Sequence, residues 1–243
     1  MEPSVEHLKN VYVCLAVSIL SAAVGLLSIG SLLKNLLSIA LLSTGGSTLF
    51  FLLVLILPDI PDKNRSLRFS FLLGFAGFSG IGLTNIFRSV MQYDPILSIT
   101  ALLETCLIFS SLSACAIFSE RGRWLFLGIP LTVLLFTLII VSFANVVDES
   151  KAVSRAIVYL SLFAMCGLVL YDTQVIIERY NNKDADFIGQ TMNVFTDFIG
   201  IYRRLLIIGV DNKLRETSED SDEDEEFLFG LFSSTAAPMH ALL

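Results

Sequence analysis

Residues 124–145, WLFLGIPLTVLLFTLIIVSFAN, contain no charged side chain. A helix rises about 1.5 Å per residue, so a helix of this length can cross the roughly 30 Å hydrocarbon core of a bilayer. Further apolar stretches of similar length lie at about 8–29, 36–57, 69–88, 96–118, 154–178 and 187–209. None of them alternates strictly between apolar and polar residues, as a transmembrane β-strand does. The sequence therefore predicts an all-α, polytopic membrane helical bundle.

The composition of the whole chain supports this prediction. Of its 243 residues, 54% are hydrophobic and 16% are charged, and the mean hydropathy is +0.75. Soluble domains are nearer a quarter charged. Residues 216–226 hold eight acids and no Lys or Arg, which leaves 16 basic and 15 acidic residues elsewhere and accounts for the net charge of −7. We predict a membrane bundle over 1–213 and a disordered acidic tail over 214–243.

The Lys and Arg residues of the short loops predict the orientation in the membrane. Loops on the side of the N-terminus carry eight of them, and loops on the other side carry four. If the seventh segment crosses fully, its four Lys and Arg residues join the poorer side and the two counts become equal. If it enters and returns, the counts become twelve and four. The rule favours six full spans with a re-entrant or strongly internal seventh segment, and a cytosolic N-terminus and tail.

Small residues and acids stand out within the predicted spans. Ala76 and Gly80 have the four-residue spacing that predicts close packing of neighbouring helices. Three acids lie within the predicted spans: Glu104, Asp172 and Asp197. An ionisable group at membrane depth costs on the order of 2.5–3.5 kcal/mol on insertion scales, so each acid is a candidate functional residue.

Asp197 belongs to a polar stripe on the seventh segment. Its members are Gln190, Asn193, Asp197, Gly200 and Arg204. Their three- and four-residue spacing places them on one face of a helix, and in a membrane such a face points to the bundle interior or to a water path. Gln190, Asn193 and Glu104 are therefore candidate pore-lining residues. Glu104 has an alternative, because it can instead turn to Arg88 or to a lipid headgroup.

Asp172 and Asp197 lie on consecutive segments joined by a short loop, so their carboxyl groups can face each other. Two facing carboxyls at low dielectric share a proton over part of the accessible pH range and form a proton-sensitive latch. When both are ionised, their oxygens can transiently hold a divalent cation such as calcium. The alternative is that each Asp makes only a local hydrogen bond at a helix end.

Several function classes are disfavoured by what the spans do not contain. The two histidines, His7 and His240, are both terminal, so no span supplies a His base or a metal-binding His. This disfavours Ser–His intramembrane proteases, HExxH metalloproteases and multi-His membrane hydrolases. No phosphate-binding glycine loop occurs. We therefore expect no catalytic residues, no resident cofactor and no nucleic-acid partner.

The two stretches that carry the aspartates resemble the signature of the Bax inhibitor-1 family, whose members contain the transmembrane Bax inhibitor motif. They are residues 165–178, MCGLVLYDTQVIIE, and residues 195–199, FTDFI. Further matches are HLKNVY at 7–12, LLGFAGFSGIGL at 72–83 and LFLG at 125–128. The similarity runs in order from about residue 7 to 213, and the family's paired aspartates match Asp172 and Asp197.

The resemblance implies a function and a location. It implies a protein of the endoplasmic-reticulum membrane that protects against apoptosis and stress and acts as a pH-sensitive calcium leak. It also implies a seventh helix in the middle of a six-helix bundle, with lipid, calcium, protons and Bcl-2-type apoptosis regulators as partners. Distant bacterial relatives have a basic latch partner for Asp172. Arg65 and Arg68 lie in the corresponding region, and neither is preferred.

Three features depart from the family pattern. Asn193 stands where the most similar animal relatives carry an acid, and Glu104 stands in place of a family glycine. The acidic run replaces a lysine-rich C-terminus, which puts the pH response and the partner binding linked to that basic tail in doubt. Thr217 and Ser221 each have an acid three positions further on, so acidophilic kinases could modify them.

Two other functions stay open on the sequence. Tyr171-Asp172 matches the Tyr-Asp of presenilin-type intramembrane aspartyl proteases, in which two facing carboxyls catalyse hydrolysis. Against this, VFTD at 194–197 is not Gly-x-Gly-Asp and no Pro-Ala-Leu follows. In the other alternative, the bundle acts mainly as an adaptor for apoptosis regulators and ion flux is not essential.

Overall fold

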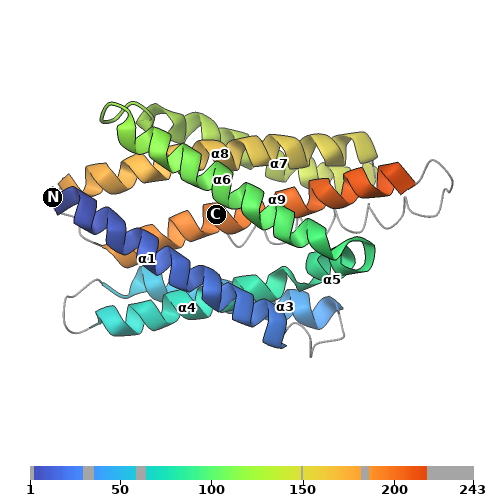
Figure 1. The fold of residues 1–243 in the computed structure, drawn as a ribbon, viewed down its shortest axis with the longest axis horizontal. Helices are drawn as coiled ribbons and strands as arrows, with labels where there is room; N and C mark the ends of the chain where they lie inside the picture. Colours follow the sequence, from blue (N-terminus) through green and yellow to red (C-terminus); the bar gives the residue numbers. More distant parts are fainter. Residues whose placement is uncertain (1–2, 30–35, 59–63, 149, 182–185, 218–243) are drawn as a thin grey trace. The chain divides into compact units, whose positions relative to one another are not determined.

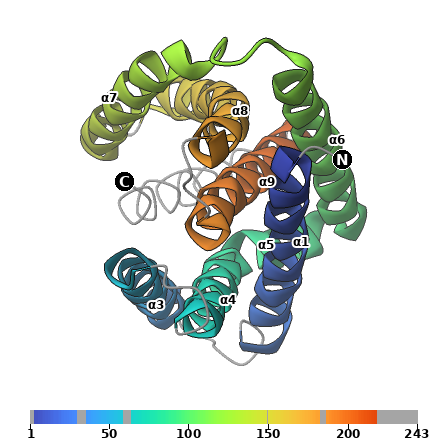
Figure 2. The ribbon, with the colours of Figure 1, turned by 90° about the vertical axis from the view of Figure 1, so that its left-hand side faces the viewer.

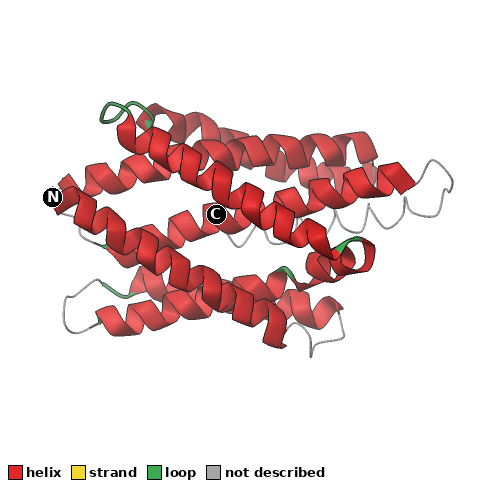
Figure 3. Cartoon of the chain, in the orientation of Figure 1, coloured by secondary structure: helices red, strands yellow, loops and turns green. Residues whose placement is uncertain are grey.

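The computed structural model describes residues 3–29, 36–58, 64–148, 150–181 and 186–217. All regular elements in these residues are helices, which confirms the all-α prediction (Figure 3). In chain order they are α1 (Pro3–Val24), the π-helical turn η1 (Gly25–Ile29), α3 (Leu36–Ile56), α4 (Arg65–Gly82), α5 (Thr84–Tyr93), α6 (Pro95–Phe118), the 3₁₀ turn η2 (Leu125–Leu127), α7 (Gly128–Asp148), α8 (Lys151–Asn181) and α9 (Phe187–Thr217) (Figure 1).

Within the described ranges, five helices are long and apolar enough to cross a membrane, so the chain is a multi-pass membrane protein. The stretches are Glu6–Leu27, Ile39–Ile56, Pro95–Phe118, Leu125–Asn145 and Lys151–Tyr180. Large apolar side chains point outward along these helices: Leu20, Leu107 and Phe163 are 66%, 69% and 70% exposed. In a bilayer such side chains contact lipid, as the predicted bundle requires.

The predicted span at 69–88 is two helices rather than one. The N–H of Leu83 donates to the carbonyl of Gly80 at 3.1 Å, which is a tighter turn than an α-helix makes, and α5 begins at the next residue. α4 and α5 together are a sixth candidate span, as a bent pair.

The chain divides into two compact units. The first contains the described residues up to Asn85 together with Val175–Thr196, and the second contains Ile86–Gln174 and the described residues from Asp197 onward. Both α8 and α9 contribute one part to each unit. The predicted acidic tail lies outside the described residues from position 218, so the boundary at 213 stays a prediction.

In the first unit, α4 packs between α1 and α3 (Figure 2). A Cβ atom at Gly80 would collide with the carbonyl oxygen of Ala22 on α1, and one at Gly74 would lie 2.8 Å from the ring of Phe50 on α3. The two glycines therefore let α4 approach both neighbours closely, and at Gly80 this is the packing that its spacing from Ala76 predicts. Phe75 fills the interior and meets Phe195 of α9 edge to face, with 5.8 Å between ring centroids.

In the second unit, the later part of α9 runs antiparallel to the earlier part of α8. Successive residues of α9 contact progressively earlier residues of α8: Gly200 meets Met165, Arg204 meets Ser161, and Asp211 meets Arg155. The Arg155–Asp211 ion pair measures 3.2 Å from Nε to Oδ1 and lies near the start of α8.

α9 is one continuous helix, so the seventh segment fits the strongly internal form of the prediction rather than a helix pair that bends back, and whether it crosses the membrane fully stays a prediction. α9 continues without a break from Phe187 to Thr217. The loop count treated Arg203 and Arg204 as loop charges, whereas both lie within the helix and Arg204 is hydrogen-bonded inside the second unit. Asp197, Arg203 and Arg204 also interrupt the apolar sequence of α9, so it is not among the candidate spans.

Candidate functional site

The structure brings the two predicted aspartates together in the second unit. Asp197 of α9 is 3% exposed, and its carboxyl group interacts with that of Asp172 on α8 through a hydrogen bond and through charge. Asp197 Oδ2 has no hydrogen-bond partner among the described residues. The geometry therefore provides two adjacent carboxyls with an unused acceptor, while their role in an ion path stays a prediction.

A buried cation lies next to this pair. Arg204, which is 8% exposed, interacts with Asp197 through charge. Its Nε donates to Ser161 Oγ at 2.6 Å, and its Nη1 donates to the carbonyl of Gly200 at 2.9 Å. The polar stripe of the sequence includes Arg204 but does not indicate that its guanidinium folds back along the helix.

Gln174 anchors α8 two residues after Asp172. Its Nε2 donates to the carbonyls of Ala116 and Glu120 and to Ser119 Oγ, at 3.3, 3.0 and 3.1 Å. Its Oε1 accepts the N–H of Trp124 at 2.8 Å. One buried amide thus provides hydrogen-bond partners for groups at the end of α6 and in the connection to α7, and it fixes the part of α8 that carries Asp172. Sequence reasoning missed this residue because a Gln inside an apolar helix has many possible partners.

The remaining candidate pore-lining residues differ in burial. Gln190 is buried in the first unit, where its Oε1 accepts from His7 Nε2 at 2.7 Å, and His7 also stacks with Tyr180. Asn193 is exposed on α9, and Glu104 is exposed on the outward face of α6. Their pore-lining roles stay a prediction.

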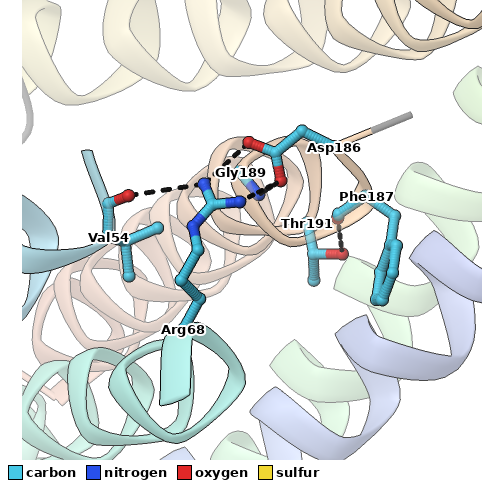
Figure 4. Close-up of polar contacts among 6 residues, drawn as sticks. All are labelled: Val54, Arg68, Asp186, Phe187, Gly189 and Thr191. Carbon is cyan, nitrogen blue, oxygen red and sulfur yellow. Dashed lines mark hydrogen bonds and ion pairs between the residues drawn. The ribbon is translucent and has the colours of Figure 1, made fainter. Parts of the chain in front are cut away.

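Arg68 and Asp186 form a second polar centre, in the first unit (Figure 4). Arg68 is 4% exposed and lies in the first turn of α4; its Nη1 and Nη2 donate to Asp186 Oδ1 and Oδ2 at 2.8 and 2.7 Å. Nη2 also donates to the carbonyl of Val54 on α3 at 3.3 Å. This bidentate pair, which we call the Arg68–Asp186 clasp, ties α3, α4 and the start of α9 together.

Asp186 is also the N-cap of α9. Its Oδ1 accepts the N–H of Gly189 at 3.1 Å, which satisfies one of the free donors in the first turn. Burial raises the pKa of the Asp186 carboxyl, but hydrogen bonds from Arg68 and from the N–H groups of Gly189 and Ile188 outweigh it and lower that pKa below its ordinary value. An Asp directly before an amphipathic helix is the signal that would have predicted this cap.

Both candidate latch arginines contact the first turn of α9. The guanidinium of Arg65 lies over the ring of Phe187, 5.2 Å from its centroid, and Arg68 binds Asp186. Thr191 closes the same turn by donating to the carbonyl of Phe187 at 2.6 Å. Its contact with Asp186 thus gives Arg68 a partner that the resemblance did not imply, and a latch to Asp172 stays a prediction.

Two further predictions concern phosphorylation and a bound metal ion. Thr217 ends α9, and Ser221 lies outside the described part of the chain, so the phosphorylation sites stay predictions. Across the described ranges, no group of three or more His, Cys, Asp and Glu side chains could hold a metal ion. A calcium ion at Asp172 and Asp197 would therefore take its other ligands from backbone oxygens or water.

Comparison with known proteins places the chain in a family. Residues 5–214 match the model of the family described as inhibitor of apoptosis-promoting Bax1. Over 202 residues the chain is 36% identical to a probable Bax inhibitor 1 of Paralichthys olivaceus, covering 83% of this chain and 84% of that protein. It is 32% identical to Bax inhibitor 1 of Homo sapiens over 214 residues, covering 88% and 89%. It is 31% identical to Bax inhibitor 1 of Drosophila melanogaster over 219 residues, covering 90% and 88%. The match extends from α1 to α9 and includes both aspartates, so this chain belongs to the family of inhibitors of apoptosis-promoting Bax1.

Proposed function

We propose that the chain suppresses apoptosis and stress-induced cell death from the endoplasmic-reticulum membrane, where it acts as a pH-sensitive calcium leak. The names of its relatives support the apoptotic role. The observation that carries the leak is the buried contact between Asp172 and Asp197 on neighbouring helices of a multi-pass membrane protein. Ionisable groups are retained at such depth mainly along ion and proton paths.

In this mechanism the aspartate pair is the gate. While the two carboxyls share a proton, a hydrogen bond joins α8 to α9. A change in pH adds, removes or redistributes that proton, which changes the link between the two helices. When both carboxyls are ionised they repel each other and offer hard oxygen ligands, so a calcium ion can bind for a time and pass on.

The test is calcium flux from liposomes that contain the purified protein, measured across pH. Asp172→Asn and Asp197→Asn should each lower the flux and flatten its pH dependence, because each removes one carboxyl of the gate. Glu120→Gln is the matched control, since it neutralises an exposed acid just after α6 that has no predicted role in the ion path and should leave the pH profile unchanged. Unchanged, pH-sensitive flux in both Asp variants would refute the mechanism.

The finer localisation is part of the proposal. We place the N-terminus in the cytosol, because the loops on its side carry more Lys and Arg in the sequence. Partners from the Bcl-2 class would then meet the cytosolic loops. Selective permeabilisation of cells that carry an N-terminal epitope tag tests this: antibody access with only the plasma membrane opened supports it, and access only after the internal membranes are opened contradicts it.

The two alternatives predict different results with the same variants. An aspartyl protease would be labelled by an inhibitor that mimics the transition state of peptide hydrolysis, and Asp172→Asn or Asp197→Asn would abolish the labelling. An adaptor would still protect cells from death when either Asp variant has lost its flux. The leak proposal expects no labelling and a loss of protection together with the loss of flux.

A further inference from the structure

Arg204 is held next to the aspartate pair by its place on α9. It follows Asp197 by seven residues, so the two lie on the same face of the helix, two turns apart. Long side chains on a helix point toward its N-terminus, which directs the guanidinium of Arg204 back toward Asp197. The charge interaction between the two groups is the result of this arrangement.

The surrounding residues hold the guanidinium in this position. Ser161 on α8 accepts from Nε at 2.6 Å, and the carbonyl of Gly200 accepts from Nη1 at 2.9 Å. A Cβ atom at position 200 would lie 3.3 Å from Nη1 and 3.1 Å from Met165 Sδ. Because any side chain at position 200 would crowd both groups, the glycine leaves the space that the guanidinium occupies.

The charges of the cluster nearly cancel. Two carboxyls that share one proton carry one negative charge, and Arg204 carries one positive charge. Buried charges are tolerated when a partner of opposite sign compensates them. A divalent cation at the same carboxyls would be repelled by the guanidinium, since both are positive and both are attracted to the same oxygens.

This inference rests on the proposed function. We propose that Arg204 is the resident counter-ion of the Asp172–Asp197 pair, and that a divalent cation occupies the pair only after the guanidinium has moved away from Asp197. Arg204 therefore competes with calcium. It limits the flux and sets the calcium concentration at which the flux reaches half of its maximum.

Calcium flux of liposome-reconstituted variants tests the competition. Arg204→Gln should raise the flux several-fold at low calcium and move half-saturation to a lower calcium concentration. Arg204→Lys keeps the charge and should stay near the wild-type values. Arg215→Gln is the matched control, because it removes an exposed positive charge from the last turn of the same helix, 18 residues after Asp197. Flux in Arg204→Gln equal to or below the wild-type flux would overturn the proposal.

A second measurement does not depend on flux. Melting temperatures of detergent-purified Asp197→Asn, Arg204→Gln and the double variant form a double-mutant cycle. If Arg204 compensates Asp197, each single variant leaves one buried charge without its counter-ion. The fall in melting temperature of the double variant should then be smaller than the sum of the falls in the two single variants. Additive changes in melting temperature would overturn the proposal that Arg204 is the counter-ion of the pair.

The two measurements separate failure of this inference from failure of the proposed function. If the melting shifts are additive and the wild-type flux depends on the aspartates, the counter-ion role of Arg204 is rejected and the calcium leak is retained. Absence of calcium flux in the wild-type protein rejects the leak and the competition with calcium. In that case a non-additive cycle still establishes Arg204 as the counter-ion of the pair.

Discussion

Replacing Asp186 by Asn and by Ala separates the two interactions of one carboxyl group. Asp186 accepts two hydrogen bonds from Arg68 and one from the N–H of Gly189. Asn keeps an oxygen for Gly189, and it is as good an N-cap as Asp, but it loses the negative charge opposite Arg68. Ala loses both the charge and the cap.

The expected losses of stability follow from burial. The side chain of Arg68 is 4% exposed and that of Asp186 is 28% exposed. The clasp therefore lies between a surface pair, worth about 0–1 kcal/mol, and a buried pair, whose disruption costs about 3–5 kcal/mol. We expect Asp186→Asn to lower the free energy of unfolding by about 2 kcal/mol, and Asp186→Ala by about 3 kcal/mol because a lost cap costs about 1 kcal/mol more. At about 2–4 °C per kcal/mol, the melting temperature falls by about 4–8 °C and about 6–12 °C.

The assay is thermal unfolding in detergent, followed by circular dichroism of the helices. Arg68→Gln is the matched partner variant, and combining it with Asp186→Asn should cost less than the two single losses together, since the second change removes a charge that the first has already left unpaired. A wild-type melting temperature for Asp186→Ala would refute a stabilising role for the clasp. Equal losses of stability in Asp186→Asn and Asp186→Ala would refute the role of Asp186 as the N-cap.

The clasp also makes stability depend on pH. The pKa of Asp186 is lowered in the folded protein, because its hydrogen bonds to Arg68 and to the backbone outweigh burial. The ionised carboxyl therefore contributes its stability above the unfolded pKa of about 4, and this contribution is lost as the pH falls through the folded pKa. The gap in melting temperature between the wild type and Asp186→Asn should be constant near neutral pH and shrink below about pH 4. A gap that does not change with pH would contradict this account.

The remaining predictions concern packing, anchoring and topology. Gly80→Ala should destabilise the protein because its Cβ meets the backbone of α1, whereas Gly77→Ala, whose Cβ has only ordinary contacts, should not; equal melting temperatures would refute the close approach. Gln174→Glu should cost about 2–3 kcal/mol in thermal unfolding, because it removes the donor that three acceptors share; wild-type stability would count against the anchor. Among the described residues, α4 and α5 as one pass make six candidate spans and α9 is not one of them, so tags before α1 and after residue 217 should both be cleaved by protease added on the same side of the membrane, and cleavage from opposite sides would show that α9 crosses as a seventh pass.

The sequence predicts the helical fold well because hydropathy reports directly on lipid contact. Five predicted spans reappear as single helices. The break between α4 and α5 escapes prediction because it arises from a backbone hydrogen bond to Gly80 and not from a proline. The continuity of α9 escapes it for another reason: a charge rule cannot tell an arginine in a loop from one whose bonds are satisfied inside the bundle, as those of Arg204 are.

The sequence predicts the site residues best where an ionisable side chain lies deep in an apolar segment and shares a helix face with other polar residues. Asp172 and Asp197 stand out because an acid in an apolar run is costly, and the structure brings these two into contact. Asp186 does not stand out, because acids are common in polar loops, and its partner Arg68 is far away in the sequence. Spacing alone does not determine which neighbour covers each position of a stripe, so the sequence does not reveal that Asn193 is exposed while Asp197 is buried.

The pairing between α8 and α9 has a consequence for how the protein is made. α1, α3 and α4 follow one another in the chain, so their contacts can form as soon as α4 has been synthesised. The polar groups that α8 presents to α9 acquire their partners only when α9, the last helix described, emerges from the ribosome. A nascent chain that stops between these helices would hold an aspartate and an arginine in the membrane without the α9 residues that pair with them. Completion of α9 is thus the step at which these polar groups of α8 first acquire their partners in the folded protein.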